Sequence, residues 1–129
     1  MKMNTIAIVG SRGFSDYEML EQFITKTIPI EKIKMIVSGG AEGADALGAE
    51  FSKKHSIPLK EHKPDWAKYG KSAGIRRNEL IVNDADVVFA FWDGKSKGTA
   101  HNIKLAQKQN KEIHICCYAK IEIAPLFAI

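Results

Sequence analysis

The stretch Ser38-Gly39-Gly40-Ala41-Glu42-Gly43-Ala44-Asp45 is the part of this chain that decides its fold. It follows the apolar run 33–37 and opens a segment whose apolar residues recur at helical spacing. A strand that passes through a glycine-rich turn into a helix leaves free backbone N–H groups at the helix start, where the helix dipole also favours an anion. The sequence therefore predicts a phosphate-binding turn here.

Two further glycine-bearing turns follow apolar runs. Gly10-Ser11-Arg12-Gly13 comes after the strand-like residues 5–9, and residues 94–99, which include Gly98 and Thr99, come after the apolar residues 86–92. The carboxyl ends of parallel strands meet at one edge of a sheet, where open α/β folds bind their ligands. We therefore expect the three turns to line one site.

The rest of the chain alternates between strand and helix patterns. Apolar spacing predicts helices at 16–28, 44–55, 73–84 and 99–109, and strands at 5–9, 34–38, 57–62, 87–91 and 112–117. In the third helix we expect Ile75, Leu80 and Ile81 to face inward, and residues 64–72 to form a functional loop. This alternation predicts a doubly wound α/β fold with a five-stranded, mainly parallel sheet in the order 3-2-1-4-5.

Composition limits the class of protein. A chain of 129 residues with 45% hydrophobic residues fits one domain, residues 1–129, in which the apolar tail 118–129 covers an edge of the fold or forms a subunit contact. No run approaches the roughly 18 apolar residues of a membrane span, and the start leads directly into a strand, so we expect a cytoplasmic protein with no membrane partner. Cys116 and Cys117 are adjacent, and the four histidines lack ligand spacing. We expect neither a metal nor a cofactor.

Positive charge is concentrated in one segment. Between Lys53 and Arg77 lie eight lysines and arginines against two carboxylates, a balance of +6, whereas the whole chain carries only +4. The segment is either a solvated lysine-rich face or a patch that attracts the phosphates of a nucleotide or a nucleic acid.

Neither standard nucleotide fingerprint is present. The first turn does not follow the GxGxxG pattern, and Gly94-Lys95-Ser96 lacks the glycine five residues upstream that a P-loop needs, because position 89 is Phe89. The sequence therefore argues against an ordinary NAD dehydrogenase and against an NTPase.

Polar residues of the three turns and of the basic segment are the candidate ligands. Ser11 and Arg12 suit a phosphate, although Arg12 could instead pair with Asp16. Asp45 could accept ribose hydroxyls or cap its helix. Trp66, with Tyr69, could stack on a base, or both could be ordinary loop aromatics. The predicted ligand-binding set is Gly10, Ser11, Arg12, Ser38, Gly39, Gly40, Glu42, Gly43, Asp45, Trp66, Arg77, Asn78, Gly98 and Thr99, and the catalytic candidates are Arg77 and Glu79.

Taken together, the motifs resemble the YspA-like branch of the SLOG superfamily. The motifs are Val9-Gly10-Ser11-Arg12, Ser38 to Asp45, Gly70-Lys71-Ser72-Ala73-Gly74 with Arg77-Asn78, and Gly94 with Gly98-Thr99. These are Rossmann-like domains related to DNA-processing protein A and to the LONELY GUY phosphoribohydrolases. The resemblance covers about residues 5–115 and implies a nucleotide or nucleotide-derived ligand over the glycine turns, in a phage or bacterial protein.

The same resemblance bears on catalysis. The phosphoribohydrolases carry a helical arginine, which Arg77 resembles, and a GGxGTxxE turn whose glutamate assists cleavage of the bond between base and ribose. Gly98-Thr99 resembles the GT of that turn, but the position of the glutamate is Asn102, and an amide cannot take up a proton. We therefore expect binding of a phosphorylated nucleotide derivative, with a homo-oligomer compatible with the apolar tail.

Two alternatives remain open. The first is a nucleotide N-glycosidase in which Glu42, Asp45 or Glu79 replaces the missing glutamate. The second is binding of single-stranded DNA by the segment from Lys53 to Arg77, a nucleic-acid partner that we rank third because the chain is short and its overall charge modest.

Overall fold

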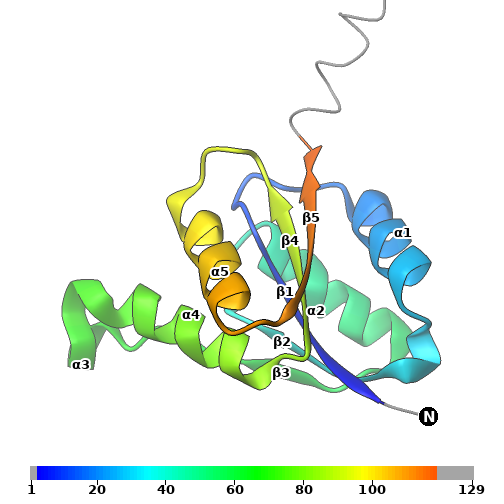
Figure 1. Ribbon diagram of the computed structural model, residues 1–129, viewed down its shortest axis with the longest axis horizontal. Helices are drawn as coiled ribbons and strands as arrows, with labels where there is room; N and C mark the ends of the chain where they lie inside the picture. The colour runs from blue at the N-terminus through cyan, green and yellow to red at the C-terminus, as the bar shows by residue number, and fades with distance from the viewer. Residues whose placement is uncertain (1–2, 119–129) are drawn as a thin grey trace, which may run out of the picture.

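A computed structural model of the protein describes residues 3–118. Its centre is a sheet of five parallel strands in the order β3-β2-β1-β4-β5, which confirms the predicted fold and strand order (Figure 1). The strands are β1 (Asn4–Gly10), β2 (Ile33–Ser38), β3 (Leu59–Glu61), β4 (Val87–Trp92) and β5 (Glu112–Cys117). The order reverses between β1 and β4, where open α/β sheets form a crevice at their carboxyl ends.

Helices cover both faces of the sheet. They are α1 (Tyr17–Thr27), α2 (Ala44–His55), α3 (Trp66–Tyr69), α4 (Ala73–Asp84) and α5 (Lys97–Lys108), with 3-10 turns η1 (Ile30–Lys32) and η2 (Gly70–Ser72). Alternate residues of a strand point to opposite faces, so Ile6 and Ile8 pack with α1 and α2, whereas Ala7 and Val9 pack with α4 and α5. Two hydrophobic cores, one on each face, hold the layers together.

Small residues let α2 lie close to the sheet. Ala44, Gly48 and Phe51 are buried on its inner side. A Cβ added at Gly48 would lie 3.1 Å from the Ile8 side chain, a distance tighter than ordinary van der Waals contact. This close approach places α2 directly against β1.

Two expectations about the region around α4 are wrong. Residues 64–72, expected to form a functional loop, instead contain α3 and η2, because Asp65 accepts a hydrogen bond from the backbone N–H of Lys68 (3.1 Å) and so caps a short helix. Ile75 and Leu80 are 52% and 50% exposed, whereas Ile81 is buried. The buried side of α4 is formed by Ile81 with Val82, and Leu80 lies two positions before Val82, about 200° around the helix from it, so Leu80 is turned to solvent.

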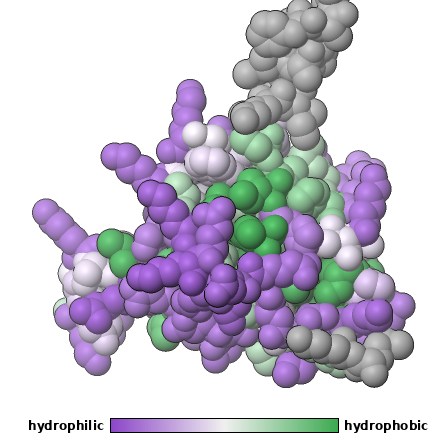
Figure 2. All heavy atoms as spheres, in the orientation of Figure 1, coloured by the Kyte–Doolittle hydropathy of each residue, from purple (hydrophilic) through white to green (hydrophobic). Residues whose placement is uncertain are grey.

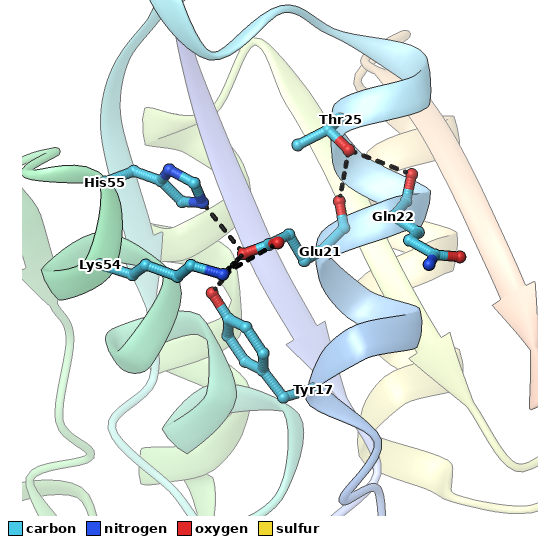
Figure 3. Close-up of polar contacts among 6 residues, drawn as sticks. All are labelled: Tyr17, Glu21, Gln22, Thr25, Lys54 and His55. Atoms are coloured by element: carbon cyan, nitrogen blue, oxygen red, sulfur yellow. Dashed lines mark hydrogen bonds and ion pairs between the residues drawn. The ribbon is translucent and has the colours of Figure 1, made fainter.

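A polar cluster joins α1 to α2 (Figure 3). Glu21 on α1 receives hydrogen bonds from Lys54 (3.0 Å) on α2 and from Tyr17 (2.8 Å), and its carboxylate lies 3.0 Å from the ring nitrogen Nε2 of His55. The hydrogen bonds from Lys54 and Tyr17, together with that from His55, lower the pKa of Glu21 from 4.5 to about 2. The cluster therefore depends on an ionised Glu21.

The expected covering role of the apolar tail lies almost wholly outside the described residues. Of that tail the structure describes Tyr118, whose ring centroid lies 4.8 Å from that of Phe14. Among the described residues, no helix has both the length and the apolar character that crossing a membrane requires.

Replacing Glu21 by Gln tests the α1–α2 cluster. Because the folded-state pKa is depressed, the stabilisation by Glu21 is present above pH 4.5 and is lost as the pH falls from 4.5 towards about 2. We expect Glu21→Gln to lower the melting temperature at pH 6 and to match the wild type near pH 2. Thermal unfolding across this pH range measures the difference, with the exposed Glu79→Gln as control. A difference that does not change with pH would contradict the explanation.

Candidate functional site

A cavity of about 420 Å³ opens at the carboxyl edge of the sheet, between the ends of β1 and β4. Eight of the predicted ligand residues line it: Gly10, Ser11, Arg12, Asp45, Arg77, Asn78, Gly98 and Thr99. Asn102 lines it as well, together with Val9, Gly13, Ala41, Ile81, Asp93 and Ser96. All three glycine-bearing turns thus contribute to one cavity.

A hydrogen-bond network ties the β1–α1 turn to the β4–α5 turn. The Ser11 hydroxyl accepts from the Asp93 backbone N–H (3.1 Å) and shares a 3.0 Å hydrogen bond with the Ser96 hydroxyl. The Asp93 carboxylate accepts from the backbone N–H groups of Ser96 and Lys95, both at 2.8 Å, and these bonds lower the pKa of Asp93 to about 2. The Ser11 hydroxyl therefore holds the two turns together, and its hydrogen bonds are made to protein groups.

Sequence reasoning missed Asp93 and Ser96. A signal was present, because an Asp followed by Gly-Lys-Ser after a strand is typical of a turn in which the aspartate accepts backbone hydrogen bonds. That turn places Ser96 at the N-cap of α5.

The start of α5 offers donors to the cavity. Within the part of the chain that the structure describes, the backbone N–H groups of Lys97, Gly98 and Thr99 have no hydrogen-bond acceptor. Thr99 is 4% exposed and lines the cavity beside the exposed Gly98. Free N–H groups at the positive end of a helix dipole favour an anion at this point.

Two backbone amides of the turn between β2 and α2 are used inside the protein. Ala44 N–H donates to the Ser11 carbonyl (3.3 Å), and Ala41 N–H donates to the Asp45 carboxylate (3.1 Å). Phosphate binding by this turn stays a prediction. The N-cap of α2 is Gly43, at φ +72°, so Asp45 holds the turn rather than capping the helix. The turn presents Ala41 and Asp45 to the cavity.

Arg77 and Asp45 are two charged residues in the lining of the cavity. Arg77 donates from Nη1 to the Gly39 carbonyl (3.1 Å) and from Nε to Asn78 Oδ1 (3.0 Å). Burial lowers the pKa of Arg77, opposed by the charge of Asp45 and reinforced by that of Arg12. Burial likewise raises the pKa of Asp45, opposed by the Ala41 N–H and by Arg77.

Arg12 extends the positive charge to the cavity mouth. Its side chain is exposed, and the expected alternative pairing with Asp16 does not occur among the described residues. Asp16 instead caps α1 by accepting from Met19 N–H (3.0 Å). A bound anion would relieve the repulsion between Arg12 and Arg77.

Asn102 is buried without a partner for its carbonyl oxygen. It is 6% exposed and lines the cavity, and its Oδ1 accepts no hydrogen bond from any described residue. Asn78, by contrast, accepts a hydrogen bond from Arg77, and its Nδ2 lies 3.2 Å from Nδ1 of His101. A buried polar atom that lacks a hydrogen-bond partner destabilises the folded state by about 1–3 kcal/mol. The stability of the fold therefore does not explain an asparagine at position 102.

The remaining predicted residues lie outside the cavity wall. Ser38 is fully buried at the end of β2, Gly39, Gly40 and Gly43 shape the turn behind the cavity, and Glu42, Trp66 and Glu79 are exposed. The described residues contain no cluster of three or more His, Cys, Asp or Glu side chains arranged to hold a metal ion.

Gly43 sets the geometry of the site and can be tested directly. A Cβ at this position would meet the carbonyl oxygens of Ser11 and Arg12, and the residue has a positive φ. We expect Gly43→Ala to destabilise the protein by about 2 kcal/mol or more. Gly13→Ala is the matched control, because nothing lies within 4 Å of its added Cβ, and should be neutral or stabilising by up to about 1 kcal/mol. Urea unfolding of both variants makes the comparison, and equal losses would contradict it.

Two comparisons of the sequence find relatives of this chain. Residues 4–69 match the model of the YspA, cpYpsA-related SLOG family. The chain is 32% identical over 113 residues to the Gene 61 protein of Mycobacterium phage D29, covering 82% of this chain and 90% of that protein.

A solved structure shares the fold. It is that of DNA processing protein A from Helicobacter pylori, described for its unique single-stranded DNA binding mode, with a TM-score of 0.64 and 22% identity over 88% of this chain. The chain spans 65% of that protein's length. On the family match and the phage relative, this chain belongs to the YspA, cpYpsA-related SLOG family.

Proposed function

We propose that the protein binds a phosphorylated nucleotide, or a small molecule derived from one, in the cavity between β1 and β4. The observation that carries the proposal is the convergence of Arg12, Arg77 and the start of α5 on one cavity at the reversal point of the sheet. Two guanidinium groups and free helix N–H groups are the donors that phosphate oxygens accept best. Membership of the family supports nucleotide or DNA binding in general.

The rest of the cavity suits the remainder of a nucleotide. Val9 and Ile81 supply apolar wall, while Asp45 and the Asn102 amide supply polar groups for hydroxyl or base nitrogen atoms. The volume of about 420 Å³ lies within the range of about 300–1,000 Å³ that is typical of small-molecule sites. A mononucleotide or a compact derivative of one therefore fits the proposal better than a long ligand.

Arg77→Ala and Arg12→Ala test the phosphate contacts. Loss of a charge-assisted hydrogen bond is worth about 1.5–3 kcal/mol, so we expect about a tenfold or greater loss of nucleotide affinity in each variant. Arg12 forms no ion pair with any described residue, so we expect Arg12→Ala to change ligand affinity without changing the stability of the fold. Arg76→Ala removes a neighbouring arginine that does not line the cavity and should bind as the wild type does.

The measurement is incubation of each protein with nucleoside monophosphates, NAD, ADP-ribose and cyclic nucleotides. Mass spectrometry then reads both the retained ligand and any released base. Retention of an intact compound by the wild type and Arg76→Ala but not by the other two variants is the expected result. Equal retention by all four proteins would overturn the site, whereas release of free base would point to cleavage, with the Asp45 carboxylate in the cavity as its first candidate.

Asn102 gives a prediction of opposite sign for stability and for binding. Removing a buried amide whose oxygen lacks a partner should leave the melting temperature unchanged or raise it, whereas a ligand that used the amide should bind less tightly. We therefore expect Asn102→Ala to be at least as stable as the wild type and to lose nucleotide affinity about fivefold or more. Thermal unfolding and a binding titration on the same sample check both parts. A variant that is less stable and binds normally would show that Asn102 serves packing.

Binding of single-stranded DNA is the second candidate function. It is supported by the fold shared with DNA processing protein A from Helicobacter pylori, whose solved structure is described for its single-stranded DNA binding mode. The concentration of lysines and arginines between Lys53 and Arg77 supports it independently. This candidate concerns a surface rather than the cavity.

A further inference from the structure

The corner formed by α3 and η2, which we call the α3 corner, extends away from the sheet beyond the start of α4 (Figure 1). Two aromatic side chains are exposed there, Trp66 at 56% and Tyr69 at 37%. Neither lines the cavity. The aromatic residues that the sequence grouped with the nucleotide site therefore belong to a separate surface.

The structure also divides the positive charge of the segment from Lys53 to Arg77. Lys54 pairs with Glu21 (2.8 Å), Lys60 pairs with Asp84 (3.0 Å), and Arg77 lines the cavity. Lys53, Lys63, Lys68, Lys71 and Arg76 form no ion pair with any described residue. Lys53 lies on α2, whereas the other four lie in the α3 corner or within a few residues of it in sequence. Figure 2 shows many hydrophilic side chains over this end of the molecule, beside paler and hydrophobic ones.

The two aromatic rings differ in what covers them. The Arg76 guanidinium lies 4.4 Å from the centre of the Tyr69 ring, and the Lys68 ammonium lies 5.1 Å from it. The Trp66 ring has no such cation among the described residues, and its edge lies near Gly74, where an added Cβ would be 3.7 Å from Cη2. Trp66 therefore keeps an accessible ring face among unpaired cations.

We propose that the α3 corner binds a single-stranded nucleic acid, with a base stacked on Trp66 and backbone phosphates on Lys68 and Lys71. Every base offers a π-face, and stacking on an aromatic side chain is worth about 1–3 kcal/mol per base. In a duplex those faces are already stacked, so a single strand fits this surface. The proposal rests on the second candidate function and assigns it a site distinct from the nucleotide cavity.

The surface fits a nucleic acid better than a protein. The other large exposed apolar residues of α4, Ile75 and Leu80, are five positions apart, which places them about 140° apart around the helix, and exposed Glu79 lies between them in sequence. They cannot form one continuous apolar face with Trp66. A polyanion, by contrast, complements the unpaired cations directly.

Fluorescence anisotropy with a labelled single strand of about 12 nucleotides, a length within the usual range of site sizes, tests the proposal. Oligothymidylate and oligouridylate are both used, since the two share the chemistry. We expect Trp66→Ala to weaken binding about tenfold, and Lys68→Ala/Lys71→Ala to reduce the slope of log affinity against log salt by about 1.4, or about 0.7 per phosphate. The control Lys26→Ala/Lys34→Ala removes the same charge from two exposed lysines on α1 and β2 and should keep the wild-type slope.

Several results would overturn the proposal. If the Trp66→Ala variant, with its wild-type melting temperature, bound the strand as tightly as the unchanged protein, the stacking site would be wrong. Duplex DNA bound as tightly as the single strand would show attraction by charge alone. If neither oligonucleotide bound, both the second candidate function and this site would be wrong. Nucleotide binding in the cavity is measured by its own experiment and would not be affected by that result.

Discussion

The close approach of three elements at Gly10 is the constraint on which the carboxyl edge depends. A Cβ on Gly10 would meet the Phe91 carbonyl oxygen of β4 and lie 2.7 Å from the Ala44 Cβ of α2, so only glycine fits. Directly after it, Ser11 N–H donates to Phe91 O (2.9 Å) and Ser11 O accepts from Ala44 N–H (3.3 Å). The backbone of Ser11 thus joins the turn after β1 both to β4 and to the start of α2.

The distribution of polar groups around the cavity follows from this framework. Where the turns meet, donors and acceptors satisfy one another, as in the network of Ser11, Ser96 and Asp93. Towards the cavity, hydrogen-bonding groups are left without partners: the first amides of α5 and the Asn102 oxygen have none among the described residues. Folded proteins rarely keep buried polar groups unpaired, and those that remain call for an explanation in function. Arg12 and Arg77 balance the carboxylates of Asp45 and Asp93 in the lining, and the free N–H groups at the start of α5 add donors that an anionic oxygen accepts well.

The sequence was sufficient for the architecture and for most of the cavity wall. The strand order was predictable because each apolar run is followed by a turn and a helix, and α2 has the predicted bounds because glycines precede it and its small residues share one side. The inward positions of α4 were predicted less well, since Ile75, Leu80 and Ile81 do not repeat at helical spacing and only their environment decides which is buried. The partner of Asp45 could not be predicted either, because a carboxylate in the first turn can cap a helix or reach back to an earlier amide, and the conformation at Gly43 selects the second.

The geometry of α4 explains why one segment serves two surfaces. Consecutive helical residues are about 100° apart, so Arg76 and Arg77 cannot face the same way. Arg77 is turned towards the Gly39 carbonyl and the cavity, and Arg76 lies over the Tyr69 ring at the α3 corner. From the sequence these two arginines formed one cationic patch with Trp66, because charge and aromatic content carry no direction. Folding into α4 divides that patch between the cavity wall and an exposed corner, the two surfaces to which we assign a small anion and a longer polyanion. Since the two surfaces share a helix but no residue, each can be altered without removing the contacts of the other.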